Sequence, residues 1–355
     1  MSNHIKPDSA TPIPDTPVPV MPVLVLLGPT AVGKTALSLR IAQTLHCEII
    51  SLDSAQVYRR LNIGTAKIRA NEMQGIVHHC LDLVEPDNEY NAARYVADAT
   101  AAMALIRGRG KIPLLVGGTG LYLRALEHGL FAVPSVDDKI KKELILQIDK
   151  EGIEKLHDEL AACDPESAAR IDGHDRSRVL RALEIYRVTG LPWSEHLRRQ
   201  TEIQAEAAIP RSMNRVEASA NHFIKIGLDC ERDLLYQRIN ERCQTMLSEG
   251  LIEETQGLLA AGYSPACKAL QTIGYRHVVA WLLDEINYEK MIELFKRDTR
   301  RYAKRQFTWF RHDPDVTWFD WQDSEAIIEF TAKALKKAMN HSKAIAANYS
   351  PTSAI

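Results

Sequence analysis

The segment that most constrains the fold reads Gly28-Pro29-Thr30-Ala31-Val32-Gly33-Lys34-Thr35. It matches the pattern G-x-x-x-x-G-K-[ST] in full. It follows an apolar run, Val23–Leu27, and precedes a helical pattern over about Lys34–Leu45. Glycines in such a loop let backbone N–H groups point at phosphate oxygens, and the next helix adds the positive end of its dipole. The sequence therefore predicts a phosphate-binding loop between a buried strand and a helix.

Two side chains of this loop have roles of their own. Lys34 supplies a cation that can bridge two phosphates, and Thr35 can ligate Mg²⁺. An NTPase also needs an acidic residue after a buried strand to hold that ion. The apolar run Ile112–Val116 is followed by glycines and Thr119 instead of an aspartate. The motif thus predicts that phosphates bind, without saying which molecule carries them.

Strands and helices alternate along much of the chain. Further elements are expected at Cys47–Leu52, Asn91–Arg107, Ile112–Val116, Leu121–Glu127 and Phe223–Leu228. This alternation is typical of a parallel sheet covered on both faces. Between about residues 135 and 189, helical periodicity continues without an apolar β-run. We expect an α/β fold, with a P-loop NTPase-like parallel sheet core and a helical insertion domain.

These patterns divide the chain into five parts. They are a disordered Pro-rich tail at 1–21, the first part of the core at 22–134, the helical insertion at 135–200, the second part of the core with basic C-terminal helices at 201–335, and a flexible tail at 336–355. The first tail combines many prolines with Ser, Thr and Asp, which is typical of disordered segments with polyproline character.

Composition narrows the class of protein. The six cysteines are scattered singly, which indicates neither a zinc site nor a disulfide framework and fits a reducing cytoplasm. The run Val23–Leu27 is too short to span a bilayer, and the N-terminus does not read as a signal peptide, so we expect a cytoplasmic protein with no membrane association. The net charge of −2 argues weakly against a nucleic-acid binder unless basic residues cluster locally.

Asp53 and Thr119 each come directly after a predicted strand or its glycine turn. In an open α/β sheet, ligands bind beyond the carboxyl ends of the strands, so both side chains are expected in the crevice beside the phosphate-binding loop. Asp53 could ligate Mg²⁺ through water, act as a general base, or cap the next helix. Thr119 could bind substrate or belong to a tight turn.

A basic and aromatic helix is expected over Lys296–Arg311. Its basic side is formed by Arg297, Arg300 or Arg301, Lys304 and Arg311, and an aromatic stripe, predicted to be the buried one, by Phe295, Tyr302 and Trp309. Asp298 is the one acid in the segment. A second basic cluster contains Arg176, Arg178, Arg181 and Arg187. Positive charge of this density suits phosphates or an RNA backbone. The adjacent His78 and His79 are interpreted as structural.

Taken together, these motifs resemble the tRNA dimethylallyltransferase (tRNA isopentenyltransferase) family. The resemblance covers about residues 23–319. The motifs that carry it are GPTAVGKT at 28–35, DSAQVYRRLNIGTAK at 53–67, HHCLD at 78–82, GGTGLYLRAL at 117–126, RALEIYRVTG at 181–190, TIGYR at 272–276 and AKRQFTWFR at 303–311.

The resemblance implies a set of roles. The loop Gly28–Thr35 would hold the diphosphate of dimethylallyl diphosphate, with Mg²⁺ at Thr35. Asp53 would be the base toward the 6-amino group of the adenosine 3′ to the tRNA anticodon, acting with Lys34 and Thr119. Contacts with the anticodon stem-loop are implied at Asp53, Ser54, Ala55, Gln56, Thr119, Lys141, Ser177, Arg178, Val179, Leu180, Arg181, Gln271, Thr272, Ile273, Gly274, Tyr275, Arg276, Lys304, Arg305 and Gln306.

The chain departs from the family pattern in places. Ile68 replaces a frequent proline, and Asp172-Gly173-His174-Asp175 replaces H-P-N-D before the second basic cluster, which leaves the local turn open. No Cys/His zinc-finger pattern follows the core, which favours a bacterial-type member, expected to be a monomer.

Three alternative functions remain. A small-molecule kinase would share the loop and the helical insertion, but it leaves the basic aromatic helix unexplained. A non-catalytic RNA-binding GTPase or ATPase would need a guanine-specific N-K-x-D, which the sequence lacks. Prenylation of free adenine nucleotides would use the same chemistry on a smaller acceptor.

Overall fold

A computed structural model describes residues 21–129, 138–199 and 222–348. The chain divides into two compact units, a larger one of residues 1–127 with 216–355 and a smaller one of residues 128–215. The first Pro-rich tail and the predicted loop at 201–220 lie outside the described residues, apart from residue 21.

The larger unit is built on a six-stranded sheet whose strands run in the order β3-β2-β4-β1-β5-β6. Every neighbouring pair is parallel, as predicted. The strands are β1 (Val23–Leu27), β2 (Cys47–Leu52), β3 (His78–His79), β4 (Ile112–Gly117), β5 (Phe223–Asp229) and β6 (Val316–Asp320). Gly117 is the register partner of both Leu27 and Leu52, so β1, β2 and β4 end at the same level.

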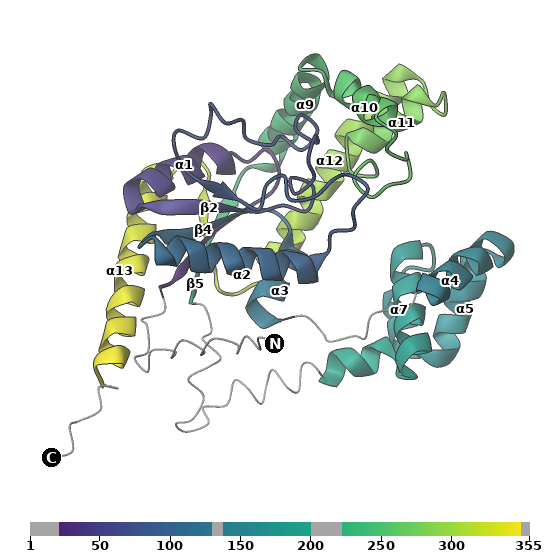
Figure 1. Cartoon of the computed structure of the whole chain (residues 1–355), viewed down its shortest axis with the longest axis horizontal. Coiled ribbons are helices and arrows are strands. Elements are labelled where there is room, and N and C mark those ends of the chain that lie inside the picture. Colours follow the sequence, from purple (N-terminus) through teal and green to yellow (C-terminus); the bar gives the residue numbers. More distant parts are fainter. Residues whose placement is uncertain (1–20, 130–137, 200–221, 349–355) are drawn as a thin grey trace, which may run out of the picture. The chain divides into compact units, whose positions relative to one another are not determined.

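Helices cover both faces of the sheet (Figure 1). α1 (Lys34–Leu45) and α13 (Ser324–Asn348) contact each other, and they pack on strands of the sheet. α2 (Ala92–Gly108) packs on β2 and β4. The β1–α1–β2 crossover and the later crossover through α2 step across the sheet in opposite directions, so right-handed connections place their helices on opposite faces. This double cover explains why β1 and β2 are buried at every position.

The remaining helices of the larger unit stand beyond the carboxyl ends of the strands or beside them. They are α3 (Gly120–His128), α9 (Arg232–Ser248), α10 (Leu251–Ala260), α11 (Tyr275–Leu282) and α12 (Tyr288–Arg311). α12 packs against α9 and α11. Asn287 begins α12 by accepting a hydrogen bond from the N–H of Lys290, an N-cap that satisfies one free amide of the first turn.

The smaller unit is helical in its described part, which confirms the helical insertion. Its helices are α4 (Asp138–Glu151), α5 (Ile153–Cys163), α6 (Pro165–Arg170) and α7 (Arg176–Thr189). A separate core contains Leu144, Leu156, Leu160, Val179 and Leu183, each fully buried. Asp175 caps α7 by accepting from the N–H of Arg178, and Asp172 accepts from the N–H of His174. The turn that the sequence left open is therefore formed by these two aspartates.

Three predictions about elements were incomplete or wrong. β3 and β6 were not predicted, because β3 is a two-residue edge strand of histidines and β6 is only partly buried. The flexible tail predicted from residue 336 is wrong as far as Asn348, because α13 continues and buries Ile327, Thr331, Leu335 and Ala338 along one side. Of the predicted buried stripe, Phe295 is buried but Trp309 is 44% exposed. Within the described ranges, no helix combines the length and the apolar character needed to cross a membrane.

Candidate active site

The phosphate-binding loop connects β1 to α1. Gly28 has φ 153°, and a Cβ there would lie 3.1 Å from Val32 Cγ1 and 3.3 Å from the Leu228 carbonyl. Gly33 caps α1 with φ 110°, a left-handed conformation that favours glycine. Its cap provides no side-chain hydrogen bond, so the first amides of α1 keep their donors for a ligand. The local conformation is that of an anion cradle.

A cavity of about 610 Å³ opens beside this loop, and we call it the P-loop cavity. Thr30, Ala31, Gly33, Lys34 and Thr35 line it, whereas Gly28, Pro29 and Val32 shape the loop without lining the cavity. Polar side chains from outside the loop and α1 also line it, and they are Ser51, Asp53, Gln56, Thr65, His78, Arg238, Glu241, Arg242, Tyr302 and Gln306.

The ammonium group of Lys34 lies within the loop. It donates hydrogen bonds to the carbonyls of Gly28 at 2.9 Å and Pro29 at 2.7 Å. Burial and the nearby charge of Arg242 lower the pKa of Lys34 to about 7, and the charge of Asp53 opposes that shift. A bound anion would favour the charged form, since an opposite charge raises the pKa of a buried lysine.

Asp53 follows β2 and faces the P-loop cavity. Its Oδ1 accepts hydrogen bonds from the N–H groups of Ala55 at 2.8 Å and Gln56 at 3.2 Å, and because no helix begins directly after Asp53, this oxygen closes a turn of the loop and does not cap a helix. Among the described residues, Oδ2 makes no hydrogen bond. The arrangement fixes the carboxylate with one oxygen and leaves the other available for substrate or metal.

Thr119 and Tyr302 stand next to this carboxylate. Thr119 Oγ1 accepts a hydrogen bond from the N–H of Ser54 at 3.2 Å. Tyr302, from α12, lies beside Thr119 and Gln306. Burial and the negative charge of Asp53 raise the pKa of Tyr302, whereas the side chains of Thr119 and Gln306 act to lower it. Thr119 is thus part of a hydrogen-bonded turn and also beside the candidate base, so its two proposed roles are compatible.

A smaller cavity of about 270 Å³ lies beside α11 and α12, and we call it the α11–α12 cavity. It brings together eight residues that the sequence had implicated in RNA contact or catalysis: Asp53, Ser54, Ala55, Gln271, Thr272, Ile273, Arg276 and Arg305. Tyr302, from the aromatic stripe, also lines it. Five residues line both this cavity and the P-loop cavity, namely Thr30, Asp53, Thr65, Arg242 and Tyr302. Molecules held in the two cavities would therefore meet at these residues, among which Asp53, Arg242 and Tyr302 carry ionisable side chains.

Sequence reasoning missed Arg238 and Arg242 on α9. Arg238 Nε donates to the carbonyl of Ala31 at 2.9 Å, and its guanidinium lies 4.0 Å from the ring centroid of Trp321. Arg242 faces both cavities one helical turn later. Their sequence spacing could have revealed them. Arg238 and Arg242 are four residues apart and alternate with the buried Leu235, Ile239 and Cys243, which places both arginines at the border of the buried face of α9.

Some implicated residues are placed where they cannot contact RNA through their side chains. Tyr275 is fully buried, accepts from the N–H of Gly64 at 3.1 Å and donates to Glu254. Val179 is buried in the core of the smaller unit. Gln306 is 5% exposed and fully engaged between two loops. The contacts with tRNA that the resemblance implies at these three positions stay predictions, and backbone atoms would have to make them at Tyr275 and Val179.

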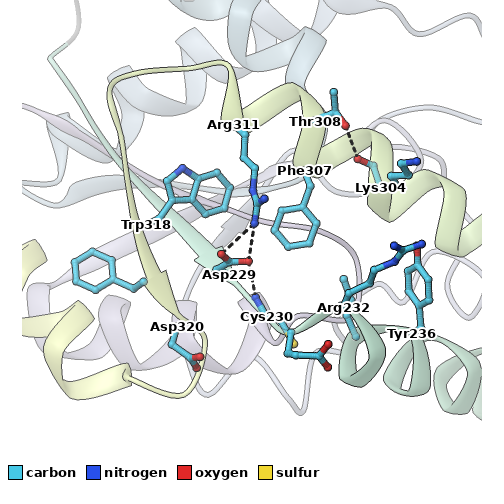
Figure 2. A pocket seen from close by; sticks show the side chains of 13 residues that line it. Asp229, Cys230, Arg232, Tyr236, Lys304, Phe307, Thr308, Arg311, Trp318 and Asp320 are labelled. Carbon is cyan, nitrogen blue, oxygen red and sulfur yellow. Dashed lines mark hydrogen bonds and ion pairs between the residues drawn. The ribbon is translucent and has the colours of Figure 1, made fainter.

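Lys304 is separated from its sequence neighbours Arg305 and Gln306. It lines a third cavity, drawn in Figure 2, which contains none of the residues of the other two cavities. Successive residues of a helix point about 100° apart, which is why Lys304 and Arg305 line different cavities. The contact of Lys304 with tRNA that the resemblance implies stays a prediction.

The remaining implicated residues belong to the smaller unit. Lys141, Ser177, Arg178 and Arg181 are exposed, and Leu180 is half-buried. Arg178 pairs with Asp175 at 3.2 Å and Arg181 with Glu184 at 3.1 Å. Arg176 pairs with Asp149 of α4, and the half-buried Arg187 pairs with Glu159 of α5. Each arginine of the second basic cluster therefore has a carboxylate partner, and three of the four arginines are exposed.

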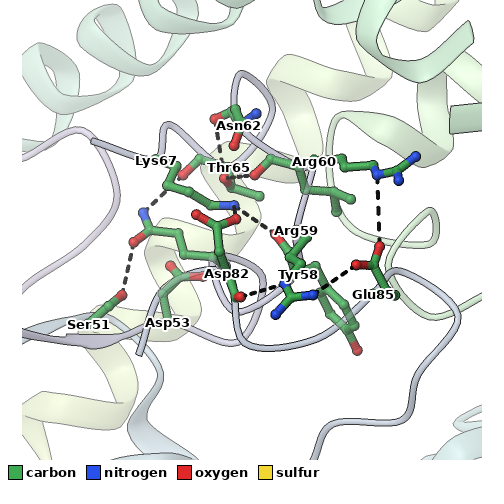
Figure 3. A network of polar contacts seen from close by, with 12 residues as sticks. Ser51, Asp53, Tyr58, Arg59, Arg60, Asn62, Thr65, Lys67, Asp82 and Glu85 are labelled. Carbon is green, nitrogen blue, oxygen red and sulfur yellow. Dashed lines mark hydrogen bonds and ion pairs between the residues drawn. The ribbon is translucent and has the colours of Figure 1, made fainter. Parts of the chain in front are cut away.

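A polar network holds the loop that follows Asp53 (Figure 3). Lys67 is buried and donates to the carbonyl of Tyr58 at 2.7 Å and to Asp82 at 2.6 Å. Gln56 connects Ser51 Oγ, at 2.9 Å, with the carbonyl of Thr65, to which it donates at 3.1 Å. These bonds fix the chain near Asp53 and near Thr65, which both line the P-loop cavity.

His78 and His79 form the edge strand β3, and His78 also lines the P-loop cavity, so the structural interpretation holds only in part. His79 Nε2 lies 2.8 Å from the buried carboxylate of Glu48, which also pairs with Arg109 at 2.7 Å and Lys111 at 3.1 Å. Among the described residues, no group of three or more His, Cys, Asp or Glu side chains is arranged to hold a metal ion. A metal in the P-loop cavity would need oxygen atoms from its substrate.

Comparison with known proteins agrees with this geometry. The family model for IPP transferase matches residues 56–313, and that for isopentenyl transferase matches residues 21–84. A tRNA dimethylallyltransferase of Desulfotalea psychrophila is 44% identical over 314 residues, covering 88% of this chain and 96% of the relative. One of Geobacter metallireducens is 44% identical over 294 residues, covering 83% of this chain and 91% of the relative.

Two solved structures have the same fold. The tRNA isopentenylpyrophosphate transferase of Bacillus halodurans aligns with a TM-score of 0.64 and 38% identity, covering 90% of this chain and 98% of that one. A eukaryotic dimethylallyltransferase acting on tRNA aligns with a TM-score of 0.67 and 29% identity, covering 85% and 74%. The fold, the motifs and these matches together establish that the chain belongs to the tRNA dimethylallyltransferase family of prenyltransferases.

Proposed function

We propose that this protein transfers a dimethylallyl group from dimethylallyl diphosphate to the 6-amino group of the adenosine 3′ to the anticodon of tRNA, and releases pyrophosphate. The observation that carries the proposal is the junction of the P-loop cavity and the α11–α12 cavity at Asp53, Arg242 and Tyr302. A diphosphate in the first cavity and a nucleoside in the second would place the reacting carbon and nitrogen at this junction.

The reaction is a substitution at the allylic carbon that carries the diphosphate. The nitrogen lone pair forms the new C–N bond, the C–O bond breaks, and its electron pair leaves with pyrophosphate. The amine gives up one proton. Asp53 is the acceptor of that proton, because its Oδ2 is free of hydrogen bonds among the described residues and it stands at the junction. General base catalysis of this kind contributes on the order of 10²–10⁴-fold.

The leaving group gains negative charge as the C–O bond breaks. The open amides at the start of α1 and the ammonium of Lys34 stand beside the position of that charge. Groups already oriented toward a developing charge stabilise it without having to reorganise. Arg242 adds a second cation on the side of the acceptor.

Magnesium is proposed as the cofactor. The hydroxyl of Thr35 and the carboxylate of Asp53 line the P-loop cavity, and oxygen ligands completed by phosphate oxygens suit Mg²⁺. When bound, the ion neutralises charge on the diphosphate. Thr35 would hold it directly, and Asp53 through water.

The acceptor is proposed to be the anticodon stem-loop of tRNA, bound by a monomer in the cytoplasm. Exposed cations support an RNA acceptor: Arg305 in the larger unit, and Lys141, Arg178 and Arg181 in the smaller one. Bases in RNA loops are unstacked more easily than those in duplexes, so the target adenosine can enter a cavity. Six free cysteines suit a reducing compartment.

A label-transfer assay tests the proposal. Protein and Mg²⁺ are mixed with unmodified tRNA and dimethylallyl diphosphate labelled in the prenyl group, with AMP replacing tRNA in one arm and ATP replacing the donor in another. Label in tRNA but not in AMP is the expected result. Label in AMP would assign the enzyme to free nucleotides, and transfer or release of phosphate from ATP would assign it to a kinase or an ATPase.

A further inference from the structure

The third cavity, of about 680 Å³, is separate from the proposed reaction site (Figure 2). It lies between the ends of β5 and β6, the start of α9 and the end of α12, and we call it the β5–β6 cavity. The side chains that matter for its chemistry are Arg232, Tyr236, Lys304, Phe307, Arg311 and Trp318. None of them lines the P-loop cavity or the α11–α12 cavity.

One wall of the β5–β6 cavity is fixed by Arg311. Its Nη2 lies 3.2 and 3.1 Å from the two carboxylate oxygens of Asp229. Its guanidinium also lies 5.1 Å from the ring centroid of Phe307 and 6.0 Å from that of Trp318, and Figure 2 shows it between the two rings. A guanidinium with both a carboxylate and two aromatic partners forms a neutral, rigid wall.

The other carboxylates of the cavity also have partners. Glu231 accepts hydrogen bonds from the N–H groups of Asp233 at 3.0 Å and Leu234 at 2.8 Å, and so caps α9. Asp320 accepts from the N–H of Gln322 at 2.9 Å. Of the three acids of this cavity, Asp229 pairs with Arg311, whereas Glu231 and Asp320 are held by backbone amides and keep their negative charge.

Within the described ranges, two cations of the β5–β6 cavity differ from Arg311 in having no carboxylate partner. Arg232 and Lys304 are exposed, and neither has a carboxylate partner in the part of the chain that the structure describes. The guanidinium of Arg232 lies 5.2 Å from the ring centroid of Tyr236. The cavity therefore places these two cations beside a half-buried aromatic ring, together with the carboxylates of Glu231 and Asp320, which keep their charge. Cations beside an aromatic ring are the combination that binds a phosphate together with a flat base.

We propose that the β5–β6 cavity binds a phosphorylated nucleoside, either a free nucleotide or one residue of an RNA strand. Arg232 and Lys304 hold the phosphate, and the base stacks on Tyr236. The volume is within the range of about 300–1,000 Å³ that is usual for small-molecule sites. This inference concerns a separate cavity and does not depend on the proposed prenyl transfer.

Calorimetric titration of the full-length protein tests the inference, with UMP and single-stranded hexauridylate as probes. Uridine is chosen because the proposed reaction site takes an adenosine. We expect saturable binding of one probe per chain. Lys304→Ala, Arg232→Ala and Tyr236→Ala should each raise the Kd about tenfold, as expected for loss of a charge-assisted hydrogen bond or of base stacking. Tyr236→Phe, which keeps the ring, should bind like the wild type.

Two controls separate this site from others. Lys34→Ala disables the P-loop cavity and should leave the Kd for UMP unchanged. Lys337→Ala removes an exposed lysine of α13 that lines none of the three cavities. It is the same substitution as Lys304→Ala at a position outside the proposed site, so it should leave the Kd unchanged.

The two sources of the ligand give different results. Equal affinity for UMP and hexauridylate identifies a nucleotide site, and much tighter binding of hexauridylate identifies a site for an RNA strand. The inference is overturned if the wild type binds neither probe, or if Lys34→Ala abolishes binding while Lys304→Ala and Tyr236→Ala preserve it.

Discussion

The side-chain oxygen of Gln306 accepts a hydrogen bond of 2.9 Å from the backbone N–H of Thr30, which is 276 residues earlier in the chain. The side-chain nitrogen of the same glutamine donates to the carbonyl of Gly118 at 3.0 Å. One buried side chain of α12 therefore joins the phosphate-binding loop to the turn after β4. The contact also explains Gly118, since a Cβ there would lie 1.9 Å from Gln306 Nε2.

Replacing Gln306 by leucine keeps its volume and removes both hydrogen bonds. A buried N–H and a buried carbonyl would then lack partners, at about 1–3 kcal/mol each. We expect the free energy of unfolding to fall by roughly 2–4 kcal/mol on the same basis. The KM for the prenyl diphosphate should rise more than kcat falls, because the loop that binds it loses its support. Denaturant unfolding and steady-state kinetics measure these effects.

Gln237→Leu is the matched control for this variant. Gln237 is exposed on α9 and bonds only to Glu241 at 2.8 Å within the described residues, so its loss should change neither stability nor KM appreciably. If Gln306→Leu unfolds and binds donor like the wild type, the coupling between α12 and the loop does not exist.

Asp53→Asn separates the two roles of this side chain. The amide oxygen can still accept from Ala55 and Gln56, but the group can no longer take a proton. We expect kcat to fall on the order of 10²–10⁴-fold, the usual contribution of a general base, with the Kd for tRNA within about twofold of the wild type. Single-turnover kinetics and RNA titration measure the two quantities.

Asp53→Ala is the companion variant, since it also removes the hydrogen-bond acceptor of the turn. It should lose the same activity and in addition about 1 kcal/mol of stability, the typical net contribution of a hydrogen bond. Near-normal turnover of Asp53→Asn would show that the residue only shapes the turn, and an equal loss of tRNA binding would show that it is mainly a binding residue.

Much of the fold follows from local sequence patterns. β1, β2 and α1 have the predicted bounds, because unbroken apolar runs and an i, i+4 stripe are local signals that the double-sided sheet reinforces. β6 and the end of α13 were not predicted, since their signal is weaker and depends on the partners they pack against. Sheet order likewise depends on contacts between distant segments.

The candidate site likewise contains residues whose place could be predicted from the sequence and residues whose place could not. Lys34, Asp53 and Thr119 follow strands, and the carboxyl ends of parallel strands meet at one edge, so their proximity was predictable. Arg242 and Tyr302 are on helices distant in sequence, and their place at the junction depends on how α9 and α12 pack. Trp309 is exposed beside Gly120, where a Cβ would lie 2.1 Å from its ring. The seven-residue repeat of Phe295, Tyr302 and Trp309 could not show which of these three rings is exposed.

The lowered pKa of Lys34, about 7, gives binding of the diphosphate a proton dependence. Between that value and the ordinary 10.5, the unfolded chain holds more protons at this group, so the lysine makes folding more favourable as pH rises through this window. Binding of an anion raises the pKa of Lys34, because it favours the charged form of the amine. At pH 8, pyrophosphate should therefore bind with uptake of a proton at Lys34.

Lys34→Arg provides the comparison, since a guanidinium stays charged throughout this range. Titration of pyrophosphate in buffers of different ionisation enthalpy gives the number of protons taken up. The wild type should take up more than the variant, by at most about one proton. Equal uptake by both proteins would mean that Lys34 is already charged before the anion binds.

Asp298 organises the arginines that stand behind the α11–α12 cavity. It pairs with Arg276 at 2.6 Å and Arg297 at 2.9 Å, and it also contacts His277 Nε2 at 3.2 Å. Burial raises the pKa of Asp298, but hydrogen bonds from Arg297, His277 and Arg276 outweigh it and hold this pKa well below its ordinary value. The carboxylate therefore stabilises the fold at neutral pH and loses that contribution as pH falls through its lowered folded-state pKa.

Asp298→Asn removes the charge while keeping the shape. We expect it to lower the free energy of unfolding at pH 7 by about 1–3 kcal/mol, the usual worth of hydrogen bonds to a charged group. The gap to the wild type should narrow on acidification toward pH 3, since only the wild type has this carboxylate to protonate. Urea unfolding at pH 7, 5 and 3 measures the gap, with Asp284→Asn, an exposed aspartate after α11, as the matched control. A gap that stays constant with pH would show that packing, and not the charge of Asp298, holds Arg276 in place.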